Sequence, residues 1–218
     1  MKTDKELRKD VIAELEYEPS IDATEIGVAV KDGVVTLTGS VHSYFEKWRG
    51  ERAAERVEGV RAVANELEVR LPGDSKRRDT DIAAAAVNAL KWNSLIPADK
   101  VKVTVEDGWI TLRGEVPHRF QKEAAESAVR NLTGVTGVSN LIQVKPSISS
   151  TEVKKKIEEA LQRMAQVDAQ QIQVETTDGK VILKGKARSW AEREEAEKAA
   201  WRAPGVSQVD DQIRVAGV

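Results

Sequence analysis

Few side chains in this sequence have the types and spacing that could do chemistry. Its 218 residues include two histidines, His42 and His118, and no cysteine. Two isolated histidines without a thiolate fall short of a zinc site, which takes three or four side-chain ligands. No candidate nucleophile accompanies either histidine, so a place in a surface loop is the simpler interpretation. We therefore expect no enzymatic activity, no metal and no cofactor.

Phosphate and nucleic-acid motifs are absent or incomplete. The glycines never form the Gly-x-x-x-x-Gly-Lys-Ser/Thr pattern of a phosphate-binding loop. Residues 134–137 do match the Gly-x-x-Gly of KH domains, but they precede an expected strand, whereas the KH motif joins two helices. The net charge of −2 also argues against a nucleic-acid partner. The short basic runs Lys76–Arg78 and Lys154–Lys156 indicate solvated surface, although each such charge near an anionic membrane contributes about 1 kcal/mol.

The recurring aspartates have a structural explanation. An Asp-Gly pair occurs three times between runs of alternating apolar residues, which predicts a β-hairpin because glycine accepts the positive φ of a type I′ turn. A further glycine closes each second run. We therefore expect these carboxylates to shape turns and not to form a catalytic dyad. The turns are Asp32-Gly33, Asp107-Gly108 and Asp178-Gly179, and the closing glycines are Gly39, Gly114 and Gly185.

Three hairpins indicate three copies of one unit. Aligned on the Asp-Gly turn, the copies match without a gap at offsets of 75 and 71 residues. Each copy has a helix with apolar residues four apart, two strands of alternating pattern, a second helix with a small-residue face and a last strand. Thr3 with Glu6, and Ser149 with Glu152, have capping-box spacing, and Asp79 is expected to cap the first helix of the middle copy.

The order of elements predicts the fold class. An antiparallel hairpin is followed by a crossover helix, which leads to a third strand parallel to the second. We predict an α+β protein of three tandem α-β-β-α-β units, each a three-stranded mixed sheet covered on one face by two helices. The first unit spans residues 1–72, the middle unit 79–146 and the third unit 149–218. The linkers are 73–78, expected to be polar and flexible, and 147–148.

The five tryptophans are the residues that this fold does not require. On a helical wheel Trp48, Trp190 and Trp201 point away from the alanine face of the second helices. Trp92 lies on the flank of the middle unit's first helix, and Trp109 on the sheet face that the helices leave open. None of them falls at a position that the repeat marks as core.

Exposed large aromatic side chains mark interfaces, and two interpretations remain open. The tryptophans could pack unit on unit or chain on chain, because small repeats stabilise one another. They could instead contact lipid or a partner. The second interpretation is supported by Lys91 and Trp92 with Leu95 and Ile96, which place an aromatic side chain beside a cation at a helix end, as at membrane interfaces.

The whole pattern resembles a known family. The hairpin, the alanine-rich helix and the closing pattern Gly-Val-x-x-Val-x-Asn/Asp-x-Leu/Ile-x-Val at residues 59–69, 134–144 and 205–215 resemble BON domains. The resemblance implies a bacterial, non-enzymatic module of osmotically inducible, periplasmic or envelope-associated proteins, with a phospholipid-binding or transport-associated role. Unlike many family members the chain shows no secretion signal, and it lacks the LysM-like segment of the potassium-linked cytoplasmic relatives.

From these observations we expect a peripheral phospholipid-binding or envelope-associated module of osmotic-stress physiology. The alternatives are a protein-interaction scaffold or homo-oligomeric adaptor, and a sensor of monovalent or divalent cations. The expected partner is an anionic phospholipid or an envelope protein, with peripheral and not integral membrane contact. Because no signal peptide and no spanning stretch is visible, the expected compartment is the cytoplasm, or the periplasm if a signal peptide was removed.

Overall fold

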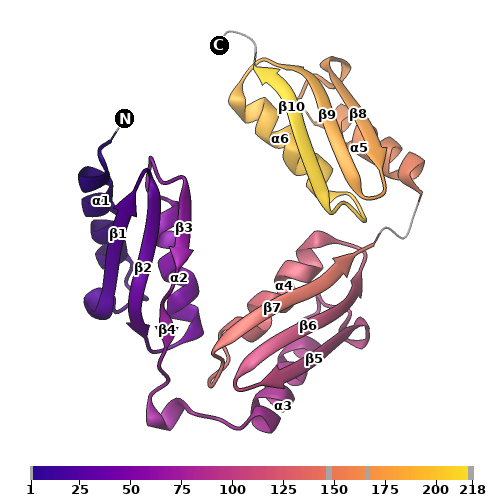
Figure 1. Ribbon diagram of the computed structural model, residues 1–218. Coiled ribbons are helices and arrows are strands. Elements are labelled where there is room, and N and C mark those ends of the chain that lie inside the picture. The colour runs from indigo at the N-terminus through magenta and orange to yellow at the C-terminus, as the bar shows by residue number, and fades with distance from the viewer. Residues whose placement is uncertain (1, 146–148, 165–166, 216–218) are drawn as a thin grey trace. The chain divides into compact units, whose positions relative to one another are not determined.

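The computed structural model describes residues 2–145, 149–164 and 167–215, which form three units of one topology (Figure 1). The expected linker 147–148 lies outside these residues. The helices are α1 Asp4–Tyr17, α2 Tyr44–Glu55, α3 Asp79–Trp92, α4 Arg119–Arg130, α5 Ser150–Arg163 and α6 Trp190–Arg202. The strands are β1 Ile26–Lys31, β2 Val34–Val41, β3 Ala62–Asn65, β4 Glu68–Val69, β5 Val101–Glu106, β6 Trp109–Val116, β7 Gly137–Val144, β8 Ile172–Thr177, β9 Lys180–Ala187 and β10 Gln208–Val215. Short 3-10 turns η1 Ala23–Glu25, η3 Ala98–Lys100 and η4 Ala169–Gln171 precede the first strand of each unit, and η2 Gly73–Ser75 lies between the first two units.

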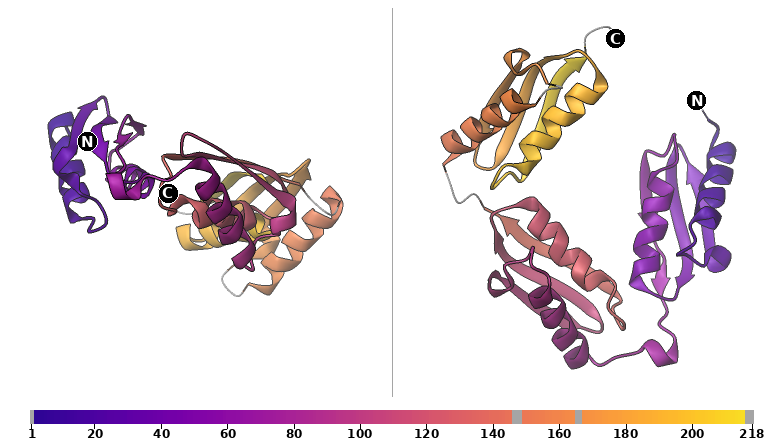
Figure 2. Two further views of the ribbon diagram at one scale, coloured as in Figure 1. Left: turned by 90° about the horizontal axis from the view of Figure 1, so that it is seen from below. Right: turned by 180° about the vertical axis from the view of Figure 1, so that it is seen from behind.

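Each sheet is mixed, with the second strand of the hairpin at its centre. In the first unit β1 pairs antiparallel with β2, and β2 pairs parallel with both β3 and β4. The third unit has the order β10-β9-β8 with the same directions, and the middle unit has the order β5-β6-β7. The two helices of each unit lie on one face of its sheet, as Figures 1 and 2 show from opposite sides. The predicted α+β fold of repeated units is therefore confirmed.

The apolar positions that repeat between copies form the buried core. Leu15, Leu90 and Leu161, which share one position on the first helix, are each at most 2% exposed. The strand residues Leu37, Leu112 and Leu183, which also share one position, are fully buried. Each such side chain contributes about 1.5–3 kcal/mol of transfer free energy, so the core repeats because the same helix face meets the same strand face in every unit.

The hairpin turns have the backbone that the Asp-Gly pairs predict. Asp32 and Gly33 have φ of 51° and 77°, and the other two pairs have nearly the same values. Positive φ at both central residues defines a type I′ turn, whose twist suits a tight antiparallel hairpin. The recurring aspartates are thus accounted for by turn geometry.

Two of these turns are anchored to the first helix by a carboxylate. The Asp79 carboxylate accepts hydrogen bonds from the backbone N–H groups of Asp107 and Gly108, both at 2.9 Å. The expectation that Asp79 caps α3 is therefore wrong. Asp79 is the first residue inside the helix, and the Arg78 carbonyl accepts the N–H of Ile82. The side chain of Asp79 is turned to the hairpin because the turn presents two adjacent donors there.

The three units differ at this anchor. In the first unit Asp4 holds the turn in the same way, at 2.9 and 3.2 Å from the N–H groups of residues 32 and 33. The equivalent residue of the third unit is Ser150, whose backbone carbonyl accepts a hydrogen bond from the Thr176 hydroxyl. Among the residues that the structure describes, no carboxylate holds the Asp178-Gly179 turn. The third hairpin is therefore held less firmly than the other two.

The closing glycines are required by a close backbone approach. A Cβ at Gly39, Gly114 or Gly185 would lie 1.9, 2.0 or 1.9 Å from a carbonyl oxygen of the passage that precedes the first strand. Their φ values of 109°, 143° and 127° are also in the region that favours glycine. No other residue can occupy these positions without moving the backbone.

The Asn/Asp that recurs in the closing pattern of each copy ties the last strand to the second helix. Asn140 donates to the Lys122 carbonyl at 2.8 Å and to the Glu126 carboxylate at 3.2 Å, and the asparagine of the first unit bonds in the same way. In the third unit Asp211 accepts from Arg193 Nε at 2.7 Å. In the third unit an ion pair thus replaces the amide-to-carbonyl hydrogen bond, and it still joins the last strand to the second helix.

The glycine constraint predicts a large and local effect. Gly114→Ala should destabilise the middle unit by about 3 kcal/mol or more, since both the contact with the Lys100 carbonyl and the positive φ oppose a Cβ. Urea unfolding of the full chain measures the loss. Gly73→Ala is the control, because nothing lies within 4 Å of its added Cβ. An unchanged unfolding curve for Gly114→Ala would refute the close approach.

The missing anchor of the third unit predicts a gain. Ser150→Asp should stabilise that unit by about 1 kcal/mol, because it supplies the carboxylate that Asp4 and Asp79 provide in the other units. Thr151→Asp places the same charge in the same helical turn but not at the hairpin, and so isolates the helix-dipole contribution. Equal gains from both variants would show that the hairpin contact adds nothing.

Candidate functional site

In the part of the chain that the structure describes, no group of titratable side chains resembles a metal centre. No cluster of three or more histidine, aspartate or glutamate side chains that could hold a metal occurs in residues 2–145, 149–164 and 167–215. His42 is exposed just after β2, and the His118 ring stacks on Phe120 with ring centroids 5.4 Å apart. Residues 134–137, which match Gly-x-x-Gly, form a turn that leads into β7, so they occupy a different structural position from the KH motif.

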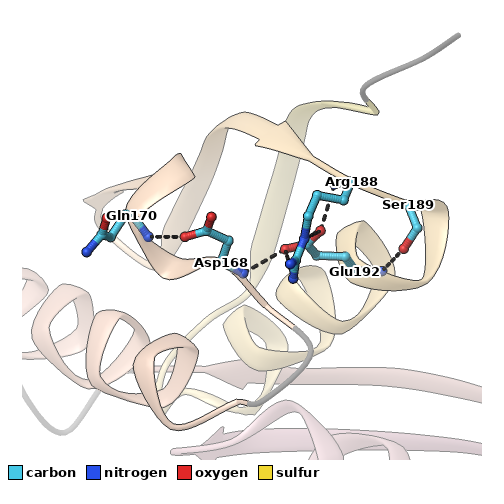
Figure 3. A network of polar contacts seen from close by, with 5 residues as sticks. All are labelled: Asp168, Gln170, Arg188, Ser189 and Glu192. Atoms are coloured by element: carbon cyan, nitrogen blue, oxygen red, sulfur yellow. Dashed lines mark hydrogen bonds and ion pairs between the residues drawn. The ribbon is translucent and has the colours of Figure 1, made fainter.

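The most buried carboxylate, Glu192, has a structural explanation. Its side chain is 3% exposed and accepts the backbone N–H groups of Asp168 and Arg188, both at 2.6 Å (Figure 3). The Arg188 guanidinium adds an ion pair at 3.1 Å. The backbone N–H of Glu192 donates to the Ser189 hydroxyl at 3.2 Å, and Ser189 thereby caps the start of α6. Glu192 thus joins the start of α6 to the turn before β8.

The other units fill this position differently. Gln121 of the middle unit accepts the His118 N–H at 3.2 Å, and the residue equivalent to Asp168 is Pro97, which has no N–H to donate. Glu46 of the first unit reaches the Ser43 hydroxyl at 3.0 Å. Because all three side chains serve the start of the second helix, Glu192 belongs to the fold and not to a reaction.

Three of the five tryptophans are strongly exposed. Trp92 is 89% exposed, Trp190 is 61% exposed and Trp109 is 47% exposed. The Arg193 guanidinium lies 5.1 Å from the Trp190 ring centroid, so that tryptophan leans on its own helix. Trp92, the last residue of α3, is the most exposed of the three.

The Trp109 ring lies over a glycine of the neighbouring strand. Three atoms of its ring lie 2.3, 2.4 and 2.6 Å from the place where a Cβ of Gly137 would be, so the ring occupies the space that a side chain there would take. Its Nε1 donates to the Ser139 hydroxyl at 2.9 Å. Trp109 therefore covers a gap that a glycine leaves in β7, which gives this residue a packing role.

The remaining two tryptophans lie partly buried on the second helices. Trp48 stacks with Phe45 at 6.3 Å between ring centroids, with the guanidinium groups of Arg49 and Arg52 nearby. Trp201 packs against the core of the third unit. Trp201 was expected to point away from the core, and the structure instead packs its ring at the core's margin, where Nε1 donates to the Glu197 carboxylate at 3.3 Å.

The outward face of α3 differs from the same face of α1 and α5. We call Ala84, Val87, Lys91 and Trp92 the α3 outer face; all four side chains are exposed. The equivalent residues of α5 are Lys155, Glu158, Gln162 and Arg163, and those of α1 are Lys9, Ile12, Glu16 and Tyr17. The same helix in the same fold is thus polar in the third unit, mixed in the first and apolar with one cation in the middle unit.

The turn after α3 extends this surface. The Asn93 side chain accepts the N–H of Leu95 at 3.0 Å, and the Asn93 carbonyl accepts the N–H of Ile96 at 3.1 Å. This turn directs Leu95 outward, where it is 54% exposed, and Ile96 inward, where it is 7% exposed. Leu95 is therefore exposed just after the helix end, whereas Ile96, which was expected at the same surface, lies in the core instead.

Sequence reasoning missed Ala84 and Val87. Val87 is 39% exposed, and an aliphatic residue within a helix carries no sequence signal that distinguishes an exposed position from a buried one. A comparison of the outward positions of the first helix between copies would have found Val87, since this apolar side chain replaces Glu158 of the third unit.

Among the helices that the structure describes, none combines the length and the apolar composition that a membrane span requires.

The Glu192 junction predicts a pH dependence. Burial alone raises the pKa of Glu192, but hydrogen bonds from the Asp168 N–H and from Arg188 outweigh it, so the pKa lies below its ordinary 4.5. A lowered pKa means that the stabilisation is present above pH 4.5 and is lost as the pH falls through the folded-state pKa.

Glu192→Gln should therefore destabilise the third unit by about 1–3 kcal/mol at neutral pH and should flatten its loss of stability in acid. Urea unfolding of the full chain at a series of pH values measures both effects. Glu46→Gln is the matched control in the first unit, where the carboxylate makes fewer bonds. A Glu192→Gln chain with the wild-type acid profile would contradict the assignment.

Comparison with known proteins agrees with these repeats. The family model of the BON domain matches residues 3–70, 78–146 and 149–217. Osmotically-inducible protein Y of Escherichia coli (strain K12) is 31% identical over 146 residues, which are 65% of this chain and 73% of that protein. Two solved structures of CdsD, a structural protein of the type III secretion system of Chlamydia trachomatis, align with 96% and 98% of this chain and 92% and 99% of theirs, at 14% and 13% identity. Their TM-score of 0.28 is too low to support a conclusion. The family match, which covers three consecutive segments and nearly all of the chain, shows that this protein belongs to the BON-domain family.

Proposed function

We propose that this BON-domain protein is non-enzymatic and binds anionic phospholipid membranes peripherally through the α3 outer face and Leu95. The observation that carries the proposal is the difference between the copies: at the four positions of this face the middle unit has three apolar side chains and one cation, the first unit has two charged side chains, and the third unit has four polar ones. A fold requirement would act on all three copies, so this difference calls for a surface role.

The chemistry of the surface suits the membrane interface. Trp92 has an amphipathic ring and stands beside the Lys91 ammonium, and such pairs lie at the level of lipid headgroups. Burying about 200 Å² of one tryptophan is worth about 5 kcal/mol at most, and one lysine near an anionic surface adds about 1 kcal/mol. Together with Leu95 and Val87 this supports reversible and salt-sensitive binding.

The physiological setting rests on the comparison. The E. coli relative is named for osmotic induction, and we propose that this chain also acts in the osmotic-stress response, at the bacterial envelope. A surface that binds lipid weakly and reversibly fits a protein whose membrane contact changes with conditions.

The test uses vesicles of phosphatidylglycerol and phosphatidylcholine with the full chain. The wild type should sediment with the vesicles at low salt, with a blue shift of tryptophan emission, and Trp92→Ala should weaken binding about tenfold or more. Lys91→Glu introduces the charge that Glu16 has in the first unit. Its loss of affinity relative to the wild type should grow as the content of anionic lipid rises.

Trp190→Ala is the matched control, because it removes another exposed tryptophan from a different unit. Its binding should equal that of the wild type. Absence of vesicle binding by the wild type at low salt, or equal losses in Trp92→Ala and Trp190→Ala, would overturn the proposal.

A further inference from the structure

The first strand of each hairpin is an edge strand of its sheet. Figure 1 shows β1, β5 and β8 as outer strands, and β2, β6 and β9 lie at the centres. An edge strand presents unpaired backbone N–H and C=O groups, which can pair with a strand of another chain. Proteins commonly guard such edges with charged side chains.

Two of the three edges carry a cation at one position of the neighbouring helix. In the first unit Arg8 Nε donates to the carbonyl of Val28, in the middle of β1, at 2.7 Å. This bond occupies the outward acceptor of the edge. The equivalent residue of the third unit is Lys154, whose ammonium lies 3.7 Å from the Glu158 carboxylate. A second strand would have to displace or desolvate these cations.

The middle unit lacks this guard. Ala83 occupies the position of Arg8, and Val103 occupies that of Val28. Within residues 2–145, 149–164 and 167–215, no side chain donates to the Val103 carbonyl. Val87, one turn further along α3, is exposed where the third unit has Glu158. The edge of β5 is thus open and bordered by small apolar side chains.

We propose that the middle unit pairs with a second copy of this chain, β5 against β5 in antiparallel orientation, so that two sheets become one continuous sheet. The two-fold axis passes through Thr104. This proposal shares only Val87 with the membrane contact, because it uses the flank of α3 nearest β5 and not Lys91, Trp92 or Leu95.

In this register the charges of one β5 strand lie opposite charges of the other sign on the second β5 strand. With Thr104 opposite its own copy, Lys102 faces Glu106 of the second copy, and the pair occurs twice. Opposite charges directly across two strands are favourable, and like charges are not. The same register in β8 would place Glu175 against itself, and in β1 it would leave Lys31 opposite Gly27. Only the middle strand is charge-matched for pairing with itself.

The helices fit the same arrangement. Since the first helix lies beside the first strand, pairing of the two β5 strands brings the two α3 helices together over the joint. Ala83 and Val87 allow a close approach there. In the first unit the same operation would bring two Arg8 guanidinium groups together, which would oppose it.

Cysteine cross-linking of the full chain tests the register directly, because the wild type has no cysteine. Opposed residues at a non-hydrogen-bonded pair have Cβ atoms about 4.5–5.5 Å apart, close to the range of a disulfide. Thr104→Cys should therefore form a covalent dimer under mild oxidation. Ala29→Cys and Glu175→Cys, the equivalent positions of the other units, are the matched controls and should remain mostly monomeric.

Sedimentation equilibrium of the full chain tests the interaction without a covalent bond. Lys102→Glu and Glu106→Lys should each weaken dimerisation about tenfold, and the double exchange should restore it. Ala83→Arg should abolish the dimer, whereas Ala84→Arg, on the next helical position, should change the dimer constant less than about threefold.

Three results would each overturn the proposal. One is a wild type that stays monomeric at about 100 μM, where even weak specific dimers are populated. Another is cross-linking of Ala29→Cys or Glu175→Cys as efficient as that of Thr104→Cys. The third is a charge exchange that fails to restore the dimer lost in the single variants.

Discussion

The close approach of a glycine to a carbonyl is the constraint on which each unit depends. Two residues before the central strand ends, Gly39, Gly114 and Gly185 lie so near the passage before the first strand that a Cβ cannot fit. This contact sets where the hairpin stops. It thereby sets where the second helix starts, and hence which face of that helix meets the sheet. The small-residue face of α2, α4 and α6 has its place only because the preceding backbone is fixed at this point.

Much of the fold could be predicted because the chain repeats it. The Asp-Gly turns have the positive φ that a type I′ turn needs, and the apolar columns are buried in every unit. Contacts between residues distant in sequence could not be predicted in this way. Asp79 is close to the hairpin only after α3 is placed beside the sheet, so spacing alone suggested a helix cap. Trp109 looked unexplained because the glycine beneath its ring, Gly137, belongs to a strand that begins nearly thirty positions later.

The candidate surface was predictable in part. Lys91, Trp92 and Leu95 are conspicuous residue types, and the structure places them together at the end of α3. Ala84 and Val87 are ordinary in a helix, and they gain meaning only from what replaces them in the other copies. Trp201 was predicted to lie outside the core and instead packs at its margin, since an outward position on a helical wheel does not prevent a long side chain from reaching the core. In a repeat protein the residues shared by all copies describe the fold, and the residues that differ are the better guide to individual roles.

The anchor between first helix and hairpin also bears on how this protein ages chemically. An Asp-Gly sequence is prone to form a succinimide, in which the glycine nitrogen attacks the preceding carboxyl group with loss of water, and hydrolysis of the ring then yields isoaspartate. In the first two units that nitrogen donates its hydrogen to Asp4 or Asp79, which keeps it from acting as a nucleophile. The third unit has Ser150 at this place, and no carboxylate within residues 149–164 and 167–215 accepts a hydrogen bond from the Gly179 nitrogen. The same difference that loosens the third hairpin makes Asp178 the residue at which covalent damage to the long-stored protein should begin.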